Sequence, residues 1–232
     1  MMDEAVNKGR LCRVDRSEAL RYLGYRGQQI DAALDARVDA VIAHCEQVSR
    51  PAWTYRVFSV SEDEAGVRLE GTTLVLTGDD IRAHLAGARE CAVMAATAGL
   101  SNERELRRLS LANGLDGMIF DAAGSSLAEA AADACNAQIV AEARARGLYA
   151  KWRFSPGYGD LPLALQPGIL RVLDAEKRLG MSLTDTNLLI PAKSVTALVG
   201  LFDAPQDDKR SCANCAFSPY CDLRRNGTPC YR

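Results

Sequence analysis

Four of the chain's eight cysteines lie within its last 21 residues. They are Cys212, Cys215, Cys221 and Cys230, written Cys-x2-Cys-x5-Cys-x8-Cys. Thiolates at short spacing are the ligands that zinc and iron–sulfur clusters take in proteins. A segment this short cannot offset its ordering entropy by burying apolar surface, whereas metal binding can supply that free energy. The tail is therefore predicted to wrap a metal centre.

The spacing of the four cysteines bears on which metal they hold. A zinc ribbon normally supplies two Cys-x2-Cys pairs, and here only Cys212 and Cys215 form one. The irregular gaps favour an iron–sulfur cluster, with zinc as the alternative. A redox-active disulfide and incidental thiols are less favoured, because a reducing compartment disfavours disulfides. The remaining cysteines are expected to be small buried apolar residues: Cys12, Cys45, Cys91 and Cys135.

Composition narrows the function classes. The chain has 232 residues, of which 48% are hydrophobic and 25% charged, as in an ordinary globular protein. A net charge of −2 provides no field to recruit nucleic acid, although five cations near the cysteines keep that as a weak alternative. No apolar stretch is long enough to span a membrane, and the start Met-Met-Asp-Glu is unlike a secretory signal. We expect a cytoplasmic protein with no nucleic-acid or membrane partner.

Motifs for catalysis by side chains are missing. The two histidines, His44 and His84, have no Cys or His at ligand spacing, and no glycine-rich phosphate loop is present. No catalytic residue is predicted. The most informative segment away from the tail runs from Arg153 to Asp160, Arg-Phe-Ser-Pro-Gly-Tyr-Gly-Asp. It offers a guanidinium group, a tight turn with exposed backbone amides and an aromatic ring, which together can clamp a carboxylate and flank a flat heterocycle.

The elements that position this segment are read from hydrophobic periodicity. Residues 14–18, with Asp15 and Glu18 as a helix-start signature, lead into a short predicted helix over residues 19–27, and a second helix is predicted over 29–48. Period-two runs between residues 55 and 76 predict short antiparallel strands. Cys91 to Thr97 is apolar on both parities, as in a strand buried on both faces. Asn102-x-x-Glu105 and Ser126-x-x-Glu129 read as capping boxes that open helices, with a region of breaks from Gly114 to Gly124. Further elements are expected at residues 79–88 (helix), 152–155 (strand), 167–179 (helix) and 195–202 (strand).

This order predicts an α+β (mixed α/β) fold. N-terminal helices are followed by a twisted mixed or antiparallel sheet with packed helices, and by the small metal-binding tail. The expected divisions are residues 1–50, a helical segment; 51–203, a core that forms one functional domain with residues 11–50; and 204–232, the cysteine-rich tail.

Several blocks together carry a family resemblance. They are Arg153-x-Ser155-Pro156-Gly157-Tyr158, the stretches 173–180, 183–186 and 190–195, and the opening Val14-Asp15 with residues 21–27. Their order and spacing resemble the activation domain of cobalamin-dependent methionine synthase, including stand-alone members of that family. The tail is similar instead to iron–sulfur appendages of corrinoid-reactivating proteins in anaerobes.

The resemblance implies a fold that binds S-adenosylmethionine and supports reductive methylation of cob(II)alamin carried by a partner. Arg153, Ser155, Pro156, Gly157 and Tyr158 match the cofactor-binding loop. Asp15 and Glu129 match acids that face the cofactor's cationic end, although each also fits a capping box. Full-length synthases differ in having a His after the loop and a Tyr where Val199 stands here.

The chain is accordingly interpreted as a stand-alone activation (reactivation) subunit, an accessory component of a methionine synthase or related corrinoid methyltransferase. Its implied partners are the corrinoid-bearing protein and an electron donor such as flavodoxin or ferredoxin. The alternative is a non-catalytic binding or docking protein whose tail holds structural zinc.

Overall fold

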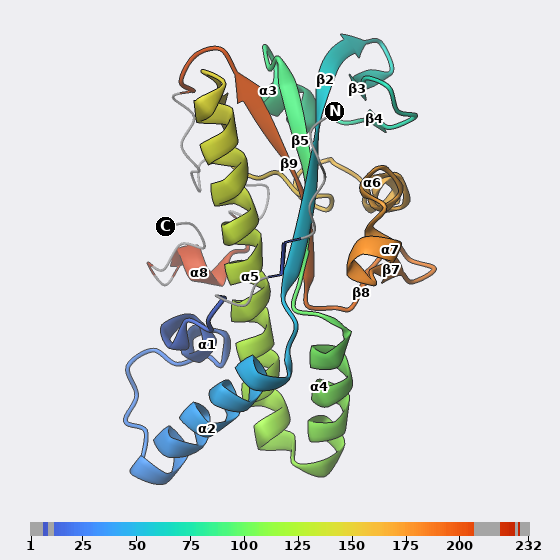
Figure 1. Ribbon diagram of the computed structural model, residues 1–232. Helices are drawn as coiled ribbons and strands as arrows, with labels where there is room; N and C mark the ends of the chain where they lie inside the picture. Colours follow the sequence, from blue (N-terminus) through green and yellow to red (C-terminus); the bar gives the residue numbers. More distant parts are fainter. Residues whose placement is uncertain (1–6, 9–11, 207–218, 226, 228–232) are drawn as a thin grey trace.

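The computed structural model describes residues 7–8, 12–206, 219–225 and 227. In this part of the chain, a group of helices lies beyond one end of an antiparallel sheet, and one long helix runs through both (Figure 1). The predicted α+β fold is confirmed. None of the described helices is long and apolar enough to cross a membrane.

The described elements have the following bounds. The helices are α1 (Arg16–Tyr22), α2 (Ala32–Val48), α3 (Asp79–Leu85), α4 (Leu100–Ala112), α5 (Gly114–Ala145), α6 (Gln166–Leu173), α7 (Ala175–Leu179) and α8 (Asp222–Arg225), with a 3-10 turn at Leu163–Leu165. The strands are β1 (Asn7–Lys8), β2 (Ala52–Asp63), β3 (Gly66–Leu69), β4 (Val75–Leu76), β5 (Glu90–Thr97), β6 (Tyr149–Ala150), β7 (Ser182–Leu183), β8 (Leu189–Ile190) and β9 (Ser194–Phe202).

The main sheet has the strand order β4-β3-β2-β5-β9-β6, with β1 also paired to β2, and every described pairing is antiparallel. A separate hairpin joins β7 and β8. At the centre, β5 confirms the prediction of a strand buried on both faces. Cys91, Val93 and Ala95 pack toward α3, α6 and α7, whereas Ala92 and Met94 pack toward α5. This alternation is the period-two geometry of a strand.

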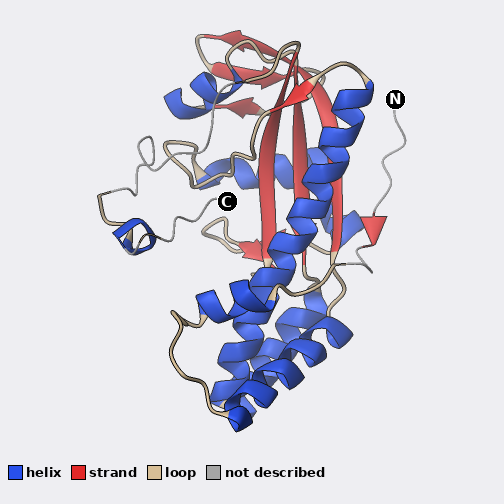
Figure 2. Cartoon of the chain, turned by 90° about the vertical axis from the view of Figure 1, so that its left-hand side faces the viewer, coloured by secondary structure: helices blue, strands red, loops and turns tan. Residues whose placement is uncertain are grey.

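Helix α5 connects the sheet to the helical group (Figures 1 and 2). Its C-terminal half packs Cys135 and Ile139 against the sheet, and its N-terminal half packs Phe120 and Leu127 against α1, α2 and α4. Its 32 residues give a length of about 48 Å. Any side chain near the middle of α5 therefore lies at the junction of the two parts of the molecule.

The predicted break from Gly114 to Gly124 is wrong, because α5 runs through it without interruption. Two of its glycines are required by packing. A Cβ on Gly117 would lie 2.8 Å from the backbone of Ser110 in α4, and one on Gly124 would lie 3.0 Å from the side chain of Asn102. The glycines let α4 approach closely and do not end the helix. Ser126 consequently lies inside α5, so the capping box predicted for Ser126 and Glu129 is also wrong.

Three other local predictions differ from the structure. Helix α4 begins two residues before Asn102, which is buried and donates to Ser49 and to Cys45. The helix expected at residues 167–179 is divided into α6 and α7 by Asp174, whose φ of 52° is left-handed. The strand expected at residues 152–155 is reduced to a single bridge between Phe154 and Leu198. In each case tertiary packing overrides the local pattern.

Candidate functional site

Asp15 begins the helix that forms one wall of the candidate site. Its carboxylate accepts hydrogen bonds from the backbone N–H groups of Ser17 (2.8 Å) and Glu18 (3.2 Å), so it caps α1. Its own backbone N–H donates to the Ser126 hydroxyl at 2.9 Å. The cap thus fixes α1 against the middle of α5, and the capping function expected for Asp15 is confirmed.

A small cavity opens between these two helices. It has a volume of about 120 Å³ and is lined by Asp15, Glu18, Tyr22, Ser126, Glu129, Ala130 and Asp133. Glu129 and Asp133 lie one turn apart on α5, and Glu18 follows Asp15 by three residues on α1. Four carboxylates therefore converge on one hollow, a setting that favours a positively charged group.

The Arg153 side chain contacts two of these acids, and its backbone lies next to the sheet. Its neighbour Phe154 is held by two backbone hydrogen bonds to Leu198, of 2.9 and 2.8 Å. The Arg153 Nη2 atom lies 2.9 Å from Asp133 Oδ1 and 3.3 Å from Glu129 Oε2. Only 13% of the side chain is exposed, and the buried Nη1 has no hydrogen-bond partner among the described residues. Asp15 and Glu129 thus line one cavity, and Arg153, from a third part of the chain, contacts it through its ion pairs with Glu129 and Asp133.

The loop after Arg153 is arranged differently from the expectation of exposed amides. Gly157, at a φ of 94°, donates its backbone N–H to Leu161 at 2.8 Å, and Tyr158 donates its own to Ser155 at 3.0 Å. These two amides are used within the turn. Pro156 is buried, Ser155 is half-buried and Tyr158 is exposed. Among the described residues, the cavity is lined by α1, by its N-cap Asp15 and by α5. The lining includes no residue of this loop.

The loop also contacts the first turn of a second helix, α3. The Asp160 carboxylate accepts hydrogen bonds from the backbone N–H groups of Asp79 (2.5 Å) and Asp80 (3.2 Å), at the first turn of α3. The segment that carries Arg153 is therefore held on both sides, by the bridge at Phe154 and by this contact at Asp160. Val199, at the position of a Tyr in full-length synthases, is fully buried in the core against α5.

Sequence reasoning missed four charged or polar residues of the cavity: Glu18, Tyr22, Ser126 and Asp133. A usable signal was present. Glu18 and Tyr22 follow Asp15 at helical spacing, and Asp133 follows Glu129 by four residues, so each pair shares a helix face. Their convergence could not be read from the sequence, because it depends on how α1 crosses α5.

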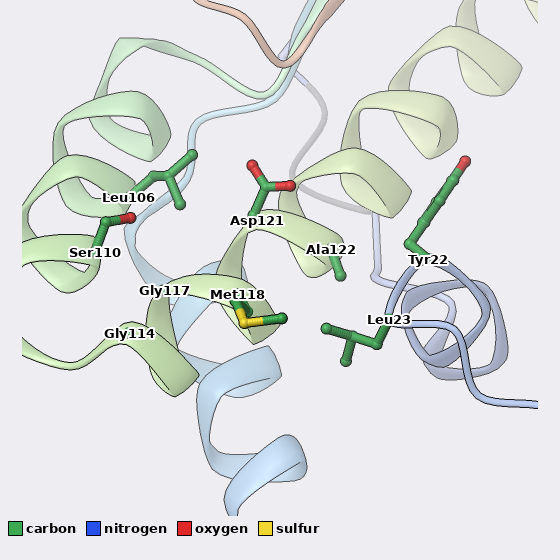
Figure 3. Close-up of a pocket in the computed structure, with 9 residues that line it drawn as sticks. All are labelled: Tyr22, Leu23, Leu106, Ser110, Gly114, Gly117, Met118, Asp121 and Ala122. Atoms are coloured by element: carbon green, nitrogen blue, oxygen red, sulfur yellow. The ribbon is translucent and has the colours of Figure 1, made fainter.

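A larger, open groove adjoins the cavity at Tyr22, which lines both (Figure 3). The groove has a volume of about 560 Å³. Tyr22, the last residue of α1, and Leu23, which follows it, border the groove on one side. Leu106 and Ser110 of α4 border it on another, and α5 forms its floor. Two of the α5 residues that line the groove, Gly114 and Gly117, have no side chain to fill it. Met118, which also lines the groove, is 62% exposed.

The predicted metal ligands fall mainly outside the described residues. This is so for Cys212, Cys215 and Cys230, whereas Cys221 is half-buried just before α8. In the described part of the chain, no group of three or more His, Cys, Asp or Glu residues could hold a metal ion. Burial raises the pKa of the Cys45 thiol to about 11 and those of Cys91 and Cys135 to about 12. These three remain protonated at neutral pH, as expected for small buried residues, and Cys12 is half-buried.

The fold is similar to that of an activation domain, as the resemblance predicted. The solved structure that establishes this is the MetH reactivation domain bound to AdoHcy. It superposes with a TM-score of 0.65 over 97% of this chain and 86% of that chain, at 16% sequence identity. No protein-family model matches the chain, and no curated protein matches it. The similarity therefore establishes the fold, and the function has to be argued from the site.

Proposed function

We propose that this chain binds S-adenosylmethionine in the cavity between α1 and α5. One observation carries the proposal: Asp15 and Glu129, distant in sequence, line a single hollow, and Arg153 forms ion pairs with two of its lining acids, Glu129 and Asp133. They do so in a fold that, in the MetH reactivation domain, is bound to AdoHcy. The amino-acid end of such a ligand carries one carboxylate and one ammonium group, and the site has groups of the opposite charge for both.

The charged groups of the site suit a ligand that has an amino-acid end, with one carboxylate and one ammonium group, next to a positively charged sulfonium. Arg153 supplies a planar fork that pairs with a carboxylate more specifically than an ammonium group does. Asp15, Glu18 and Glu129 supply acceptors for the ligand's ammonium group, and their negative charge favours the positive sulfonium centre of S-adenosylmethionine. Tyr22, between the cavity and the groove, offers an aromatic face beside them.

The larger role that we propose is reactivation of a corrinoid-bearing methyltransferase, with methionine synthase as the reference case. On the partner, cob(II)alamin gains one electron and then takes the methyl group of S-adenosylmethionine, which leaves as S-adenosylhomocysteine. This chain would bind and orient the methyl donor and dock on the partner, so it need supply no acid or base. The groove beside the cavity leaves an open surface next to the bound ligand.

The tail is part of the same proposal. Cys212, Cys215, Cys221 and Cys230 would hold an iron–sulfur cluster that passes the electron on, drawing it from a donor such as flavodoxin or ferredoxin. Elemental analysis after anaerobic purification tests this. Iron and sulfide with visible absorption support the electron-transfer role, whereas stoichiometric zinc in aerobic and anaerobic preparations alike would replace it with a structural tail.

Ligand-dependent stabilisation tests the binding function. A ligand that binds only the native state raises stability by about 2.7 kcal/mol at one hundred times its Kd. The melting temperature should therefore rise with S-adenosylmethionine and with S-adenosylhomocysteine, but not with adenosine or methionine at equal concentration. Equal shifts with all four compounds, or none, would refute the proposed function.

A further inference from the structure

Arg153 is largely covered, whereas the two acids that pair with it are exposed. The guanidinium side chain is 13% exposed, whereas Glu129 is 50% exposed and Asp133 is 72% exposed. The Nη1 atom is buried and lacks a hydrogen-bond partner among the described residues. The Nη2 atom bears both ion pairs, the shorter one to Asp133 at 2.9 Å. The accessible side of the guanidinium is thus already occupied.

A ligand carboxylate can reach this guanidinium only by replacing one of the two acids. Asp133 is the one that can leave at least cost. Its side chain is the more exposed of the two, so it returns to water with little desolvation change. Arg153 is only 13% exposed, but Asp133 is 72% exposed, so water screens this ion pair and limits its contribution to on the order of 1 kcal/mol. Glu129, one turn earlier on α5, then remains to accept the ligand's ammonium group.

We infer that Asp133 is a specificity-determining residue of the cavity. In the ligand-free protein it occupies the position on Arg153 that the ligand's α-carboxylate takes, and binding exchanges one ion pair for the other. A ligand without that carboxylate cannot make the exchange and leaves Asp133 in place. The site therefore selects compounds with an intact amino-acid end. This inference rests on the proposed function and adds to it a residue and a selection rule.

The test is calorimetry on the Asp133→Asn variant. Asparagine is nearly isosteric with aspartate but gives up the charge that competes for Arg153. We expect affinity for S-adenosylmethionine and S-adenosylhomocysteine to rise about two- to fivefold, which corresponds to losing one ion pair that water screens. Affinity for decarboxylated S-adenosylmethionine should not rise. Simple loss of negative charge from an acidic cavity predicts the opposite sign, a weaker affinity for the cationic ligand.

A matched control is available in Asp203→Asn. Asp203 has the same 72% exposure and also pairs with an arginine, Arg89, at 3.4 Å, but it lies outside the cavity. This variant should leave all three affinities unchanged. In an Arg153→Gln background, Asp133→Asn should give no increase, because the two residues act on one contact.

The outcomes separate the inference from the proposed function. If the wild type binds S-adenosylmethionine and Asp133→Asn binds it equally or more weakly, the inference is overturned and the proposed function stands. An equal gain for the decarboxylated compound also overturns it. If neither protein binds any of the three compounds, both the inference and the proposed function fail.

Discussion

At the scale of single residues, Asp15 combines two functions that substitutions can separate. Its carboxylate caps α1 through the N–H groups of Ser17 and Glu18, and it also lines the acidic cavity. Serine is as good an N-cap as aspartate but carries no charge. Asp15→Ser should therefore keep the helix start and remove only the charge, whereas Asp15→Ala removes both.

We predict that Asp15→Ala lowers the free energy of unfolding by about 1 kcal/mol and that Asp15→Ser changes it little. Both variants should bind S-adenosylmethionine several-fold more weakly. Urea denaturation and calorimetry measure the two effects. If Asp15→Ser bound the ligand as tightly as the wild type, Asp15 would be a helix cap and nothing more.

Some residues of the candidate site could be predicted from the sequence, and others could not. The resemblance predicted one site for Arg153, Asp15 and Glu129; in the structure Asp15 and Glu129 line one cavity, and Arg153 forms an ion pair with Glu129. For Ser155 to Tyr158 a ligand contact stays a prediction. Asp133 was missed, because the sequence does not show that an exposed acid of α5 lies 2.9 Å from Arg153, which is distant in the chain and largely covered.

At the scale of elements, the close approach of α4 to α5 depends on Gly117. A Cβ there would lie 2.8 Å from the Cα of Ser110, which is backbone and cannot simply rotate away. Gly117→Ala should lower the free energy of unfolding by about 1–3 kcal/mol, the usual cost of overpacking. Chemical denaturation measures this.

The control lies three residues earlier in the same helix. A Cβ on Gly114 meets nothing within 4 Å, and its φ is not left-handed. Gly114→Ala should be neutral or stabilise by about 0.4–1 kcal/mol through the unfolded chain. Equal destabilisation by both substitutions would show that helix packing is not the cause.

The contact between α2 and α4 predicts a dependence on pH. Hydrogen bonds from Arg108 and, second, from His44 lower the pKa of Glu105 to about 2. A carboxyl whose pKa is lowered in the folded state stabilises the fold above its ordinary pKa near 4.5, and this contribution is lost as the pH falls toward 2. Arg108 is exposed, so screening limits the contribution to on the order of 1 kcal/mol.

Glu105→Gln should accordingly be less stable than the wild type at pH 7, and the difference should shrink between about pH 4.5 and pH 2. Denaturation midpoints of both proteins across this range provide the measurement. A difference that is constant with pH would show that the side chain acts by packing and not by charge.

Some helices and strands could be predicted from the sequence, and others could not. Strand β5 and helix α2 could be predicted from hydrophobic periodicity. Nearly every residue of β5 is buried, and α2 buries a single face. The failure in α5 has a clear cause: Gly117 and Gly124 look like helix breakers in sequence, whereas the fold needs them where helices touch. Local propensity cannot distinguish these two uses of glycine.

At the scale of the whole molecule, the three hydrophobic clusters are formed by residues between Cys12 and Leu201. These clusters thus include none of the tail residues that the structure describes. We predict that Cys221→Ser lowers the bound iron or zinc and leaves the melting temperature unchanged. Elemental analysis and thermal unfolding of the same preparation check this. A large drop in melting temperature would mean that the tail belongs to the core.

The architecture gives α5 the central position in the proposed function. Its middle turns carry Glu129 and Asp133 at the place where α1, the sheet and the helical group meet. The sequence could predict the α+β class and the C-terminal part of α5, but not that α1 folds back onto this helix. That long-range contact, held by Asp15 and Ser126, creates the cavity.

The central claim is that Arg153 and the acids around it bind S-adenosylmethionine. It is tested most directly by titrating S-adenosylmethionine into the wild type and into Arg153→Lys by calorimetry. Lysine keeps the positive charge and loses the planar fork. The account predicts saturable one-to-one binding to the wild type, weakened about tenfold or more in the variant, as expected for a lost charge-assisted hydrogen bond. Equal affinity for the two proteins, or no heat with either, would contradict it.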